Sequence, residues 1–191
     1  MKEKTLTKSG FKTKELVLCA LFTALTAIGA FIQIPVPNMD YFTLQFFFVL
    51  MAGMLLGAKL GAISTAVYVL LGLAGVPIFA AGGGISYVFR PSFGYLLGFI
   101  LAAFVTGFIL ERTSLKGTAG CLTAAFAGLL ICYGVGLVYK YIILNSYMDT
   151  PTPWSVVLLS CFPLDLPGDI VLCILASLLG VRLRPVIRRG I

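Results

Sequence analysis

Four polar side chains lie within or beside apolar runs, where burying an unpaired polar group is costly: Gln45, Arg90, Asp165 and Asp169. Asp165 and Asp169 are four residues apart, so on a helix they share a face. A cation at the mouth of one helix and a carboxylate at the mouth of another could hold a ligand with an acid at one end and N–H donors at the other. The alternative is a structural ion pair between Arg90 and Asp169.

The composition requires that these groups be positioned by membrane-embedded helices. Of the 191 residues, 60% are hydrophobic and 11% are charged, and the mean hydropathy is +1.05. An ordinary soluble domain has roughly a quarter of its residues charged. The net charge of +7 is concentrated before the first apolar run and after the last, so no basic face for nucleic acid is expected. The expected surrounding is a lipid bilayer.

Pro, Gly and charged residues divide the chain into about six apolar segments, each a candidate transmembrane helix. The predicted fold is an all-α integral membrane protein of about six transmembrane helices. A Lys-rich segment (1–15) and a basic tail (184–191) flank the helical unit (16–183). The segment 154–162, bracketed by Pro153 and Pro163, is predicted to be re-entrant or interfacial. The helices are predicted at 16–34, 42–58, 62–73, 92–110, 119–143 and 166–183.

The distribution of basic residues predicts the orientation of these helices. Placing both termini in the cytoplasm leaves only Arg90 and Lys140 of the 14 Lys and Arg residues outside. The expected location is therefore a cell membrane, crossed several times, with cytoplasmic termini.

Small residues recur in two patterns. The run 82–84 is all Gly, but no Lys followed by Ser or Thr comes after it, so a nucleotide loop is not expected. It is either a flexible loop or a place where backbone amides approach a ligand. Small pairs four residues apart at Ala20 and Ala24, 53 and 57, and 94 and 98 predict close helix packing. On the first helix this face could instead meet a partner protein.

Enzymatic activity is not supported by the sequence. His is absent, so Ser-His and zinc hydrolases are excluded, and the five Cys lack CxxC spacing for a metal site. Intramembrane aspartyl proteolysis would need a second membrane-embedded Asp on another helix. No Walker motif is present. A binding subunit that borrows an energy source, without a cofactor or metal of its own, fits these absences.

Several motifs in one order and spacing carry a resemblance to a known family: IPVP at 34–37, FTLQ at 42–45, MAGMLLG at 51–57, YVLLGLAGVPIF at 68–79, GGISYVFRPSFGYLLGF at 83–99 and LPGD at 166–169. Together they resemble the BioY family, the biotin-specific S components of energy-coupling-factor (ECF) transporters. The resemblance covers nearly the whole chain after the Lys-rich head.

This resemblance implies a six-helix S component with a ligand pocket near the extracellular side. It implies docking onto a transmembrane T component that couples to two ATPases, with Ala20 and Ala24 on the docking face. Asp169 would accept hydrogen bonds from the ureido N–H groups of biotin. On physical grounds, Arg90 would pair with the valerate carboxylate. The predicted ligand-binding residues are Asp169, Arg90, Tyr87, Gly83, Gly84, Gln45, Phe79, Tyr95 and Leu172.

One position departs from the family pattern. The family usually has a Lys three residues after the Asp that Asp169 matches, and Leu172 stands there instead. Either the pocket has rebuilt that polar contact, or the ligand is a related acid such as lipoate, whose dithiolane ring needs no ureido partner.

Overall fold

The protein is described from a computed structural model over residues 12–35, 41–113, 117–161 and 165–188. Its main helices are α1 (Thr13–Phe31), α2 (Gln45–Leu56), α3 (Ala58–Leu73), α4 (Phe93–Arg112), α5 (Gly117–Ser146) and α7 (Asp165–Arg188). Within these ranges α1, α4, α5 and α7 are long and apolar enough to cross a membrane, while α2 and α3 are shorter apolar helices. The predicted all-α membrane architecture is confirmed.

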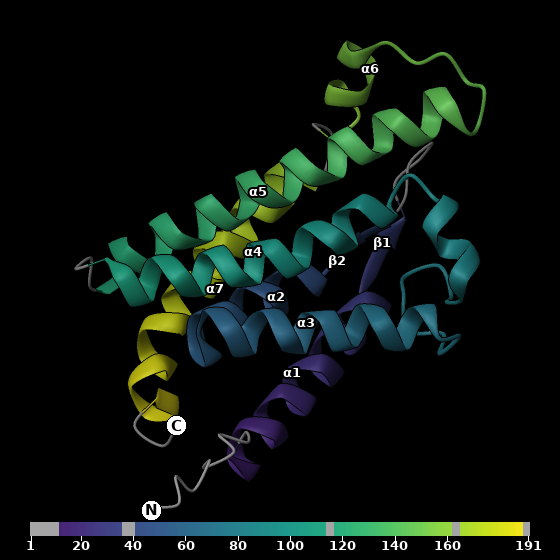
Figure 1. The fold of residues 1–191 in the computed structure, drawn as a ribbon. Coiled ribbons are helices and arrows are strands. Elements are labelled where there is room, and N and C mark those ends of the chain that lie inside the picture. The colour runs from purple at the N-terminus through teal and green to yellow at the C-terminus, as the bar shows by residue number, and fades with distance from the viewer. Residues whose placement is uncertain (1–11, 36–40, 114–116, 162–164, 189–191) are drawn as a thin grey trace, which may run out of the picture.

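Helix α2 forms the centre of the bundle. Ten of its 12 residues are buried, and it contacts α1, α3, α4 and α7. A helix that is apolar on all sides belongs in such an enclosed position. Figure 1 shows that α1 begins and α7 ends at one end of the bundle, whereas the strand β1 (Gln33–Pro35) and the short helix α6 (Trp154–Leu159) lie at the other.

Three helix boundaries differ from the prediction. The first helix ends at Phe31 instead of Ile34, because Pro35 disfavours helical geometry in the residue before it. Ile34 then pairs with Phe42 in an antiparallel hairpin of β1 and β2 (Tyr41–Thr43), which the sequence did not predict. Gly57 has a φ of 91°, which ends α2 and lets α3 begin at Ala58 instead of Ala62.

Helix boundaries in the C-terminal half differ as well. Helix α7 extends to Arg188, so part of the predicted tail 184–191 is helical. The guanidinium of Arg184 donates to the carbonyl of Leu110 at 2.6 Å, which ties this extension to the end of α4. The predicted re-entrant segment contains α6, a helix of only six residues. The 3-10 helix η1 (Ile85–Phe89) precedes α4.

Small residues allow the helices to approach closely, as predicted for Gly53, Gly94 and Gly98. A Cβ added at Gly53 would lie 2.4 Å from the carbonyl oxygen of Ala103 on α4. At Gly94 and Gly98 it would meet Tyr139 and Cys132 of α5 at 2.3 and 2.8 Å. Gly57 forms the turn between α2 and α3 and is also approached closely by α4, because a Cβ added at Gly107 would lie 2.5 Å from the carbonyl carbon of Gly57.

Gly53→Ala is expected to lower the free energy of unfolding by about 1–3 kcal/mol, because the added methyl group forces two backbones apart. Gly134→Ala is the matched control, since that helical glycine is exposed and has nothing within 4 Å of its added Cβ. Thermal unfolding in detergent compares the two variants. Equal midpoints would show that α2 and α4 are not in tight contact.

Candidate ligand-binding site

A cavity with polar and aromatic walls opens among four segments that are distant in the sequence. These are the hairpin and the start of α2, the region from Ala80 to the first turns of α4, the later half of α5, and the start of α7. The aromatic lining consists of Tyr41, Phe42, Phe46, Tyr87, Tyr95, Phe99 and Tyr133, and the polar lining of Thr43, Gln45, Ser92, Cys132, Lys140, Asp165 and Asp169.

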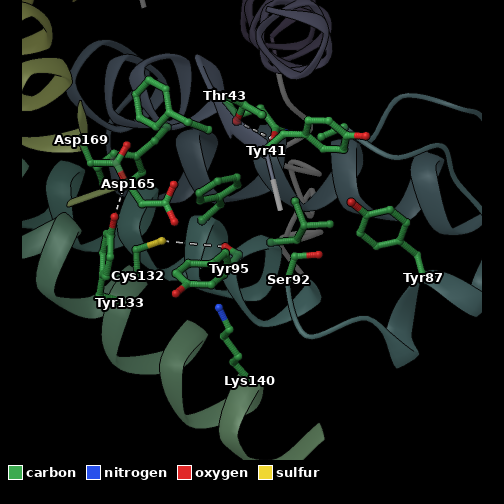
Figure 2. Close-up of a pocket in the computed structure, with 16 residues that line it drawn as sticks. Tyr41, Thr43, Tyr87, Ser92, Tyr95, Cys132, Tyr133, Lys140, Asp165 and Asp169 are labelled. Atoms are coloured by element: carbon green, nitrogen blue, oxygen red, sulfur yellow. Dashed lines mark hydrogen bonds between the residues drawn. The ribbon is translucent and has the colours of Figure 1, made fainter. Parts of the chain in front are cut away.

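Asp169 is held in place by a neighbouring helix. The hydroxyl of Tyr133 on α5 donates to Oδ2 of Asp169 at 2.8 Å (Figure 2). Asp165, one turn earlier on α7, lines the same cavity, as their shared helix face predicted. The second oxygen of the Asp169 carboxylate has lone pairs that a ligand N–H group can use.

Gln45 belongs to a hydrogen-bond chain behind the cavity wall. Its amide donates to the hydroxyl of Tyr68, which donates to the carbonyl of Ile78 at 3.0 Å. Thr43 donates to the side-chain carbonyl of Gln45 at 3.0 Å. These hydrogen bonds link the hairpin, α2 and α3, and they fix the orientation of the Gln45 side chain, which is 4% exposed.

Four of the predicted binding residues line the cavity: Gln45, Tyr87, Tyr95 and Asp169. Arg90 is exposed, and its guanidinium carbon lies 5.3 Å from the centre of the Tyr87 ring. Arg90 is not among the residues that line the cavity, and the alternative Arg90–Asp169 pair is not formed within the described part of the chain.

The other four predicted residues lie behind the wall or away from it. Phe79 is buried against Tyr68 and Tyr87, and Leu172 is buried in the core. A Cβ at Gly83 would meet the carbonyl oxygen of Val76 at 2.3 Å. The amide of Gly84 donates to the carbonyl of Gly72 at 2.7 Å, so the Gly-rich run folds onto the end of α3.

Several lining residues were not predicted from the sequence, among them Tyr133, Lys140 and Ser92. Lys140 donates from Nζ to the hydroxyl oxygen of Ser160 at 2.9 Å. A signal was available, because Tyr133 and Lys140 are seven residues apart on one predicted helix and therefore share a face. A shared helix face does not show that the face lines a cavity, however. Only the hydrogen bond between Tyr133 and Asp169 places it there.

The fold and the cavity define a helical membrane protein with a small polar binding pocket near one end of its bundle. The sequence profile of the BioY family matches residues 1–189, and the chain belongs to that family.

Relatives and a solved structure agree with this assignment. The chain is 45% identical to the probable biotin transporter BioY of Lysinibacillus sphaericus, over 92% of this chain and 89% of that protein. It is 42% identical to the biotin transporter BioY of Thermotoga maritima, over 71% and 76%. A crystal structure of the S-component for biotin from an ECF-type ABC transporter matches 92% of this chain and 95% of its own, with 27% identity and a TM-score of 0.79.

Proposed function

We propose that this protein is the substrate-binding membrane subunit of an ECF-type importer and that its ligand is biotin. The observation that carries the proposal is the oriented carboxylate of Asp169 in an aromatic-walled cavity, in a chain of the BioY family. A carboxylate accepts N–H hydrogen bonds from a ureido group, and such charge-assisted bonds are stronger than neutral ones. The aromatic rings provide apolar area for the bicycle and the aliphatic arm.

The proposal is tested by mass spectrometry of the small molecules that the purified protein retains, followed by titration with biotin. We expect a biotin mass and saturable binding without turnover. A lipoate mass with no biotin binding would replace the ligand and keep the transporter class. Formation of a product by the purified chain alone would contradict the class.

Transport requires an energy source, which we assign to partner subunits. The sequence contains no Walker motif, so the chain has no recognisable ATPase of its own. The S-component likeness supports docking onto a T component with two ATPases. Concentrative uptake is then expected only in cells that also produce these partners.

The termini are proposed to face the cytoplasm, which places the cavity near the outer surface. Helix α1 begins and α7 ends at the end of the bundle opposite α6 (Figure 1). Cysteines introduced by Lys12→Cys and Ser146→Cys, both at exposed positions, are expected to differ in labelling from outside the cell, with only the latter reactive. Labelling of Lys12→Cys in intact cells would contradict this orientation. The five natural Cys are buried and give a low background.

A further inference from the structure

Lys140 on α5 places a cation in the wall of the same cavity as Asp169. Among the described residues it is the one Lys or Arg that lines this cavity. Lys140 follows Tyr133 by two helical turns, so it stands about 10 Å along α5 from the tyrosine that holds Asp169. Figure 2 shows the amine of Lys140 and the Tyr133–Asp169 pair at separate parts of the cavity. Because Lys140 and Tyr133 leave α5 at positions about 10 Å apart along the helix, they can contact different ends of an elongated ligand.

The ammonium group of Lys140 keeps hydrogen-bonding capacity for a ligand. It has three N–H donors, and Ser160, which follows α6, accepts one of them. The Ser160 hydroxyl in turn donates to the carbonyl of Val157 at 2.7 Å. In the part of the chain that the structure describes, no other acceptor is bonded to this amine. Helix α6 thus helps to position Lys140 while leaving two donors available.

A second polar group in the cavity also lacks a partner. The hydroxyl oxygen of Ser92, just before α4, is buried and has no hydrogen-bond partner among the described residues. Leaving a buried hydroxyl unsatisfied costs about 1–3 kcal/mol. A ligand oxygen that accepts from Ser92 would remove that cost.

The charges of the cavity determine which end of the ligand belongs at Lys140. Asp165 and Asp169 both line the cavity, so an acidic ligand would add a further negative charge. Lys140 can offset it, whereas Arg90 is exposed and lies over the Tyr87 ring. We infer that Lys140 binds the carboxylate of the ligand, that Ser92 in the wall of the same cavity donates a further hydrogen bond to the ligand, and that Asp169 binds its opposite end. This inference rests on the proposed function.

The test compares the binding of biotin and of biotin amide by purified variants. Lys140→Gln is expected to weaken biotin about ten- to hundredfold, as the loss of one charge-assisted hydrogen bond implies, and to leave biotin amide nearly unchanged. Lys140→Arg should retain most of the affinity for the acid. Arg112→Gln is the matched control, because Arg112 is exposed and does not line the cavity, and it should affect neither ligand; Arg90→Gln tests the competing assignment. Ser92→Ala should produce a smaller loss, again selective for the acid.

Three results would overturn the inference. Equal weakening of the acid and the amide by Lys140→Gln would show a structural role for Lys140. Unchanged biotin affinity would show that the amine does not reach the carboxylate, and an acid-selective loss in Arg90→Gln would assign the role to Arg90. Failure of the unaltered protein to bind biotin at all overturns the proposed function, and is thereby distinguished from failure of the Lys140 assignment alone.

Discussion

Ala24→Trp is expected to abolish biotin uptake by cells that contain the partner subunits, while the isolated protein still binds biotin. Ala20 and Ala24 are exposed on α1 and line an apolar groove with Leu60, Ile63 and Val67 of α3. Small residues let another helix approach closely. An indole in the groove would occupy the space into which a helix of the T component is proposed to dock. The groove shares no lining residue with the cavity that contains Asp169, so ligand binding should not change.

The control for this variant places the same side chain on another exposed face of the same helix. Leu21 is 50% exposed and does not line the groove, so Leu21→Trp should leave uptake nearly unchanged. Uptake of labelled biotin, binding by the purified protein and thermal unfolding are measured for both variants. If Ala24→Trp loses binding and folding together, the Ala face is internal packing and the docking assignment is wrong.

Asp169→Asn is expected to weaken biotin binding by the purified protein at least about a hundredfold. The carboxylate would accept two ureido N–H groups, and each charge-assisted hydrogen bond contributes about 1.5–3 kcal/mol. The Asn side chain has one acceptor oxygen and an amide whose N–H groups would face the ligand donors. Isothermal titration with biotin measures the loss.

Two comparisons show whether the loss comes from recognition of the ureido group. Lipoate offers no N–H donor, so any weak lipoate binding should be spared by Asp169→Asn. Tyr133→Phe removes the hydroxyl that holds Asp169 at 2.8 Å, and it should weaken biotin by a smaller factor. Unchanged biotin affinity in Asp169→Asn would mean that the carboxylate has a structural role and that the site assignment fails.

The helical architecture followed from the sequence because apolar length and interruptions by Pro and Gly are local properties. The boundary at Gly57 was missed, because a glycine inside an apolar run is typical of close packing as well as of a turn, and Gly57 serves both: it lies against α4, and its φ of 91° ends α2. The hairpin after α1 was also missed. Its strands have three residues each, which is too short for a sequence period, and they are stabilised by pairing with each other.

The binding site was predicted less completely than the fold. Four predicted residues line the cavity: Asp169, Gln45, Tyr87 and Tyr95. Each lies near the end of an apolar helix or segment, and such ends can be recognised in a sequence. The choice between Arg90 and Lys140 could not be made in the same way. Arg90 flanks an apolar run and Lys140 lies within one, and the stacking of Arg90 on Tyr87 depends on the local geometry of η1.

The unequal lengths of the helices bear on how the protein sits in its bilayer. At 1.5 Å per residue, α2 and α3 extend only about 18 and 24 Å, against a hydrocarbon core of about 30 Å. The shortness of α2 is shielded, because neighbouring helices enclose it. Helix α3 also exposes Leu70, which does not line the groove formed with α1, so the hydrophobic mismatch acts on the lipid-facing side of α3. The bilayer beside α3 is therefore expected to thin locally. The cost of this thinning grows with acyl-chain length, and it is absent where the longer α4 and α5 face the membrane.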